Sequence, residues 1–101
     1  MKEEVKIDSS EFWVKIVEFL QQNWALIEDG EKVKVWFIHD GSGVFDSLEF
    51  KNIEEAEKGL YRNGFKKYSD PSENFTDFVV PPKKPFYSAP RNIYSSGEFW
   101  R

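Results

Sequence analysis

The chain has 101 residues, a single histidine, no cysteine and a formal net charge of −4. This length fits one domain, residues 1–101, and a chain without cysteine forms no disulfide, so the core must come from side-chain packing alone. The charged N-terminal segment 1–8 and the absence of a long apolar run predict neither a signal peptide nor a membrane span, and we therefore expect a cytoplasmic protein.

The first expected element is an amphipathic helix over residues 9–28. Asp8 and Glu11 have the spacing of a capping box, with Asp8 as the N-cap. Apolar residues then recur at the spacing of one helical face, at Trp13, Ile16, Val17, Leu20, Trp24 and Ile27. Residues 28–31, with the sequence Glu-Asp-Gly-Glu, are expected to end this helix.

Residues 33–38 and 44–50 are expected to form the two strands of a β-hairpin. Both segments are rich in β-branched and aromatic residues. The sequence Asp-Gly-Ser-Gly at residues 40–43 lies between them, and its glycines tolerate the positive φ angles of a tight turn.

A second helix is expected to follow the hairpin. Asn52 precedes Glu55 by three residues, which is the pattern of an N-cap, and Asn63–Gly64 is a typical helix end. Residues 65–68 then alternate as a third short strand, and residues 75–80 are the candidate for a fourth.

These elements predict an α+β fold in which a small antiparallel sheet of three to four strands packs against two helices. The body comprises residues 1–80, and residues 81–101 form an irregular C-terminal tail. Four prolines prevent a regular helix there, while five aromatic residues are too many for a solvated, disordered segment. We expect this tail to lie on the domain or on a partner.

The turn between the two hairpin strands brings together the residue types of a hydrolytic site. His39 could serve as a general base and Ser42 as a nucleophile, with Asp40 beside them. Neighbouring strand residues point to opposite faces, however, and the strand–turn–helix context of a nucleophile elbow is missing. We therefore favour a structural role for this turn. One histidine and no cysteine also predict no metal site, and no cofactor motif is apparent.

Charge is unevenly distributed along the chain. Residues 1–80 carry ten Lys or Arg against seventeen Asp or Glu, a net −7, whereas residues 81–101 carry a net +3. An acidic body argues against nucleic acid and favours a basic protein partner. The expected partner-binding residues combine carboxylates with two tail aromatics: Glu28, Asp29, Glu31, Asp46, Glu54, Glu57, Tyr94 and Trp100.

Small size, an acidic body, surplus aromatic residues and no catalytic cluster favour a non-enzymatic protein-binding module. In composition and layout the chain resembles small cytosolic immunity proteins of bacterial toxin systems, and this resemblance implies an inhibitor that occludes a basic partner such as a toxin. Two alternatives stay open. One is a ligand-binding or hydrolytic domain that uses His39, Asp40 and Ser42. The other is an assembly subunit that associates through its tail, so that a monomer or a weak homodimer is expected.

Overall fold

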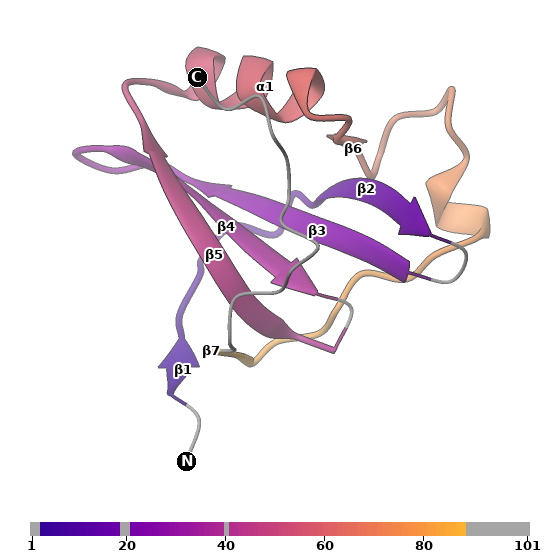
Figure 1. The fold of residues 1–101 in the computed structure, drawn as a ribbon, viewed down its shortest axis with the longest axis horizontal. Coiled ribbons are helices and arrows are strands. Elements are labelled where there is room, and N and C mark those ends of the chain that lie inside the picture. The colour runs from indigo at the N-terminus through magenta and orange to yellow at the C-terminus, as the bar shows by residue number, and fades with distance from the viewer. Residues whose placement is uncertain (1–2, 19–20, 40, 89–101) are drawn as a thin grey trace.

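The computed structural model describes residues 3–18, 21–39 and 41–88, and it shows a seven-stranded sheet with an α-helix on one face (Figure 1). In chain order the elements are β1 (Glu4–Val5), β2 (Trp13–Glu18), β3 (Gln21–Glu28), β4 (Val33–His39), β5 (Gly43–Phe50), α1 (Ile53–Arg62), β6 (Lys66–Lys67), the 3-10 turn η1 (Phe75–Asp77) and β7 (Phe86–Ser88). The strand order across the sheet is β1-β7-β5-β4-β3-β2-β6. Neighbouring strands are antiparallel except for β5 and β7, which are parallel.

The prediction of three to four strands packed against two helices is wrong. The expected helix over residues 9–28 is instead an antiparallel pair, β2 and β3, with Trp13 opposite Ala25 and Val14 opposite Trp24. The candidate fourth strand at residues 75–80 contains η1. The described residues therefore form a mixed sheet with a single α-helix, α1.

Burial on both faces of the sheet explains why the helical spacing was misleading. The residues that would share one helical face are divided between the two sides of the sheet, because Trp13 belongs to the core cluster beneath α1 and Trp24 to the cluster on the opposite face. Ile16, from the same set, is 49 % exposed. A strand covered on both faces needs apolar residues at consecutive positions, and such a run matches a helical spacing by chance.

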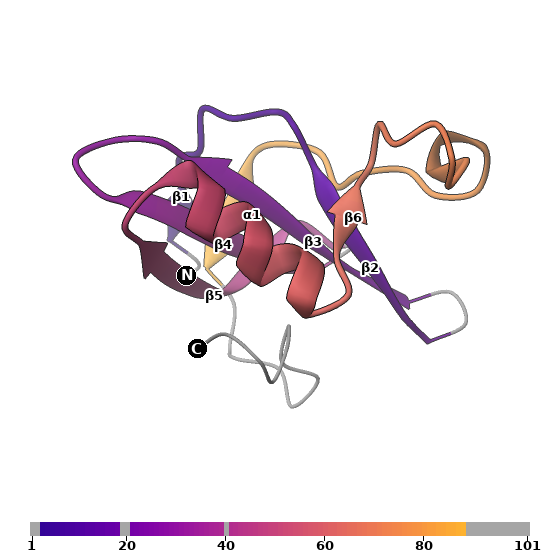
Figure 2. The same cartoon turned by 90° about the horizontal axis from the view of Figure 1, so that it is seen from above.

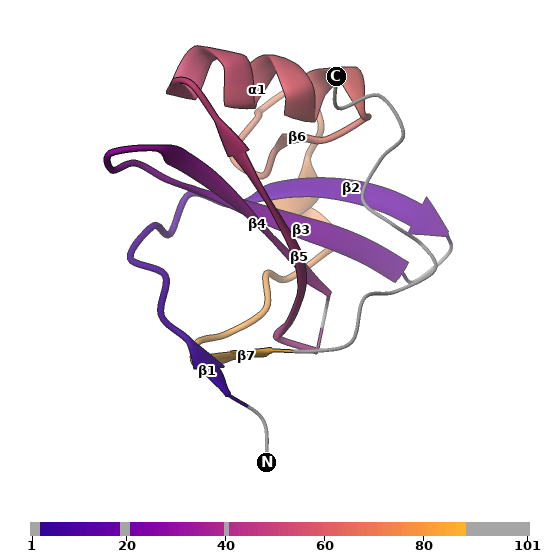
Figure 3. The same ribbon diagram turned by 60° about the vertical axis from the view of Figure 1, so that its left-hand side comes forward.

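The two core clusters use alternate residues of the same strands. The cluster beneath α1 includes Val35 and Phe37 of β4, which pack with Leu60 of α1 and with Phe65. The opposite cluster includes Ile38 of β4 and Phe86. Figure 3 shows α1 on one side of the sheet, with the N-terminal segment and the segment leading into β7 on the other side. Alternation along each strand thus supplies both layers.

The hairpin of β4 and β5 and the helix α1 confirm the sequence-based expectations. Val33 pairs with Phe50, and a register shift after Phe37 marks a β-bulge near the turn. At the start of α1 the side chain of Asn52 accepts a hydrogen bond from the backbone N–H of Glu55 at 2.8 Å. The helix ends before Gly64, whose φ is +90°.

The described part of the C-terminal tail, residues 81–88, ends in a strand of the sheet, β7. β7 lies between β1 and β5, and Phe86 at its start is 1 % exposed. The backbone N–H of Ser88 donates to the Glu3 carbonyl at 2.7 Å, and that of Tyr87 donates to the Ser42 carbonyl at 3.0 Å. The tail thus contributes a buried aromatic residue, Phe86, to the body. The high proline content of the tail gave no indication that it would pair as a strand.

Candidate functional site

The turn between β4 and β5 uses the polar atoms of His39 and Ser42 for its own structure. The backbone N–H of Gly41 donates to Nδ1 of His39 at 3.0 Å, and the hydroxyl of Ser42 donates to the Lys83 carbonyl at 2.8 Å. Ser42 adopts a positive φ of 68°, as tight turns require. The turn therefore links the hairpin to the segment that precedes β7.

These hydrogen bonds bear directly on whether the turn could act as a hydrolytic site. When Nδ1 of His39 accepts a hydrogen bond, the neutral ring carries its proton on Nε2 and has no free lone pair for proton abstraction. The Ser42 proton points to a backbone carbonyl, and the His39 ring stacks on Phe45 with centroids 6.5 Å apart. Asp40 lies outside the described residues. The hydrogen bonds of His39 and Ser42 favour the structural role of the turn.

Four carboxylates gather at the turn between β3 and β4, and we call this group the acidic tip. Its members are Glu28, Asp29, Glu31 and Glu49. With Gly30, Lys32 and Lys34 they line a shallow depression of about 270 Å³. Four carboxylates against two ammonium groups leave the tip with a net charge of −2.

The central lysine of the tip is directed to an aromatic ring. Strand pairing places Lys34 opposite Glu28 on one side and opposite Glu49 on the other. Its Nζ lies 4.3 Å from the centre of the Trp36 ring, a cation–π contact. Glu28 instead accepts a hydrogen bond from the backbone N–H of Asp8 at 3.2 Å. Among the described residues the tip carboxylates form no ion pair, so their charge is available to a partner.

The remaining acidic residues expected to bind a partner lie elsewhere. On α1, Glu54 pairs with Lys58 at 3.2 Å, and Glu57 approaches Lys67 at 3.7 Å. Asp46 lies within β5 and accepts a hydrogen bond from the backbone N–H of Ser47 at 2.8 Å. The structure thus brings Glu28, Asp29 and Glu31 together, and the other three are not among the residues that line this depression. Tyr94 and Trp100 lie outside the described residues.

Sequence reasoning missed Glu49, which completes the acidic tip. The hairpin pairing of Lys34 with Glu49 could have revealed it, since both strands were correctly expected. It also missed the loop that follows η1, where Phe78 and Val80 are among the most exposed apolar residues. A β-strand at residues 75–80 was expected to turn alternate side chains toward the core. The exposure of both Phe78 and Val80 was therefore not predicted.

Comparisons with protein-family models, with curated proteins and with solved structures found no match to this chain. Within the part of the chain that the structure describes, no three His, Asp or Glu side chains are grouped so that they could hold a metal ion. The same residues include no helix with the length and apolar character needed to cross a membrane. The geometry of the surface is therefore the basis for a functional proposal.

Proposed function

We propose that the protein is a small, non-enzymatic binding module that recognises a basic protein partner in the cytoplasm. The observation that carries this proposal is the acidic tip, whose carboxylates Glu28, Asp29, Glu31 and Glu49 lack ion-pair partners among the described residues. An inhibitor or immunity role toward a basic toxin is the form of this function that the acidic composition favours.

Physical arguments support the tip as the contact surface. Carboxylates on a protruding turn attract a cationic surface over distances of about 8–10 Å at physiological salt, and they increase the association rate. The turn joins β3 to β4, two central strands of the sheet, so a rigid support holds these charges. Carboxylates already paired with lysines, such as Glu54 and Glu57 on α1, contribute less to attraction.

The test is binding measured at two salt concentrations with matched charge variants. The purified chain is immobilised and exposed to lysate of its own source cells, and each retained protein is then purified and titrated against it. We expect a basic partner whose affinity falls steeply between low and high salt. The triple change Glu28→Gln, Asp29→Asn and Glu31→Gln should weaken binding about tenfold at low salt and reduce the salt dependence, because three attractive charges are lost.

The control variant removes similar charge from another part of the surface. Glu11→Gln with Glu55→Gln changes two exposed carboxylates outside the tip and should leave the affinity within about twofold of wild type. An equal loss of affinity per charge removed in the two variants would show that only net charge matters, and not the position of the charges. The absence of any stoichiometric partner at low salt would refute the proposed function itself.

A further inference from the structure

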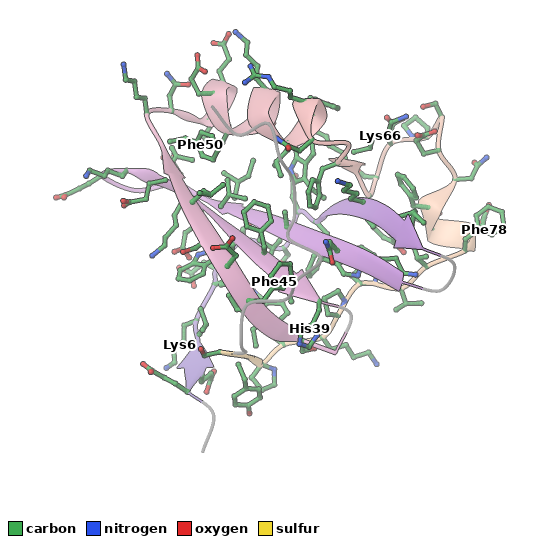
Figure 4. All side chains as sticks on the ribbon, in the orientation of Figure 1. Lys6, His39, Phe45, Phe50, Lys66 and Phe78 are labelled. Atoms are coloured by element: carbon green, nitrogen blue, oxygen red, sulfur yellow. The ribbon has the colours of Figure 1, made fainter. Side chains whose placement is uncertain are left out.

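The loop after η1 exposes two large apolar side chains at the opposite end of the sheet from the acidic tip. Phe78 is 81 % exposed and Val80 is 74 % exposed. The ring of Phe78 projects away from the body in Figure 4, and Figures 1 and 2 place η1 and the β3–β4 turn at opposite ends. Isolated exposed apolar residues are common on protein surfaces, so the surroundings of this pair decide its meaning.

The backbone that carries this pair is fixed by hydrogen bonds and by packing. The N–H groups of Phe78 and Val79 both donate to the Phe75 carbonyl, at 3.0 and 2.9 Å. The Tyr68 hydroxyl donates to the Val79 carbonyl at 2.7 Å, and Phe75 and Val79 pack against the buried cluster. The chain therefore partly buries Phe75 and Val79 and presents Phe78 and Val80 outward. A side chain on a fixed backbone loses less conformational entropy when a partner buries it.

The segment of residues 69–80, which contains η1 and this apolar pair, is acidic. Residues 69–80 contain Asp70, Glu73 and Asp77 and no lysine or arginine. The hydroxyl of Ser72 and then its backbone N–H donate to the Asp70 carboxylate and lower its pKa below the ordinary value of 3.8, so this group is charged at neutral pH. Glu73 forms an ion pair with Lys66 of β6, which compensates its charge. The two apolar side chains thus belong to a segment with a net negative charge, and Asp77 directly precedes Phe78 in the chain.

We propose that Phe78 and Val80 anchor a protein partner that presents an apolar socket bordered by lysine or arginine side chains. An aromatic side chain inserted into a pocket and surrounded by complementary charge is a common arrangement of an interface hot spot. This inference takes the class of partner, a basic protein, from the proposed function. The contact surface, however, is separate from the acidic tip.

The negative charge of this segment disfavours both a second copy of the chain and an anionic membrane as the binding partner of this surface. A second copy that met the loop symmetrically would place Asp70 and Asp77 near their own counterparts, and like charges in an interface are costly. An anionic membrane surface would likewise repel the loop. A basic protein surface satisfies both the apolar pair and its acidic border.

The experiment uses the full chain expressed in its source cells. The substitution Phe78→p-benzoylphenylalanine introduces a photo-cross-linker into it. The protein that is cross-linked is identified, produced separately and titrated against wild type, Phe78→Ala, Val80→Ala and the control Thr76→Ala. We expect Phe78→Ala to weaken binding at least about tenfold and Val80→Ala by a smaller factor. Thr76→Ala, at an exposed position within η1, should stay within about twofold. Thermal unfolding should be unchanged in all three variants, since these side chains are exposed.

Four outcomes would overturn this inference. If the partner loses affinity with the acidic-tip triple variant but binds Phe78→Ala normally, the proposed function stands and the anchor at the loop is rejected. If the cross-linked species is a dimer of this chain, a second copy occupies the surface instead. If phosphatidylglycerol vesicles bind wild type but not Phe78→Ala, a membrane occupies it. If wild type saturably binds no protein, the proposed function and the anchor both fail.

Discussion

Tyr68 shows how much a single residue can connect in a small sheet protein. Its ring lies 5.5 Å from that of Trp24, and its backbone N–H donates to the Phe12 carbonyl at 2.9 Å. Its hydroxyl reaches the Val79 carbonyl at 2.7 Å. The residue therefore joins β3, the segment before β2 and the loop after η1. A partly buried hydroxyl that is hydrogen bonded both stabilises the fold and restricts the loop.

Removing this hydroxyl should have a measurable and specific cost. Tyr68→Phe keeps the ring but leaves the Val79 carbonyl without this donor, so we expect the free energy of unfolding to fall by about 1 kcal/mol. Urea denaturation measures the change. Tyr61→Phe is the matched control, because Tyr61 is half exposed and its hydroxyl forms no hydrogen bond within the described residues. Equal stability of the two variants would show that the Tyr68 hydrogen bond contributes nothing.

Among the elements, α1 was predictable from the local sequence, because residues at its two ends specify where the helix begins and ends. Asn52 precedes α1 with an extended backbone and caps the N–H of Glu55, and the last turn ends at Asn63. Glu54 and Glu55 lie in the first turn, where negative charge complements the helix dipole. The strands β2 and β3 lack such local instructions, and their structure depends on pairing with β4 and β6.

The cap of α1 supports a prediction at the scale of the element. Asn52→Ala removes the acceptor for the Glu55 N–H and should lower the free energy of unfolding by about 1 kcal/mol. Lys51→Ala, at the exposed preceding position, should change it by less than about 0.5 kcal/mol. Chemical denaturation of both variants provides the comparison. We expect Asn52→Asp to retain most of the stability, since a carboxylate caps equally well. A stable Asn52→Ala variant would contradict the capping role.

In the whole molecule, segments far apart in the sequence are joined through β7. This strand lies between β1, near the N-terminus, and β5, and its Phe86 belongs to the cluster that also holds Ile7 and Trp24. The rings of Phe12 and Phe86 meet edge to face with centroids 6.3 Å apart. The face of the sheet away from α1 is therefore covered by segments from both ends of the described chain.

Loss of the Phe86 ring should destabilise the whole domain. Phe86→Ala leaves a cavity among Phe12, Trp24 and Ile7, and we expect a loss of about 3–5 kcal/mol in the free energy of unfolding. Tyr87→Ala, at the neighbouring and 38 % exposed position, should cost much less. Thermal and urea unfolding distinguish the two variants. If Phe86→Ala unfolds like wild type, β7 is peripheral to the stability of the fold.

Elements with local signals were predictable from the sequence. The cap of Asn52, the end of α1 at Asn63–Gly64, the hairpin of β4 and β5 and the short strand at residues 66–67 all follow from turn residues, capping residues and short-range alternation. The acidic character of the Glu28–Glu31 turn was also evident. Each of these depends on interactions between residues close together in the chain.

The remaining features depend on long-range contacts, because burial is a property of the assembled layers. The apolar run before Glu28 satisfies a helical spacing, yet the covering of both sheet faces makes it two strands. Contacts between segments far apart in the sequence place Glu49 in the acidic tip, bury Phe86 in the core and leave Phe78 exposed. Which side chains meet a partner depends on these long-range contacts, and no local pattern encodes them.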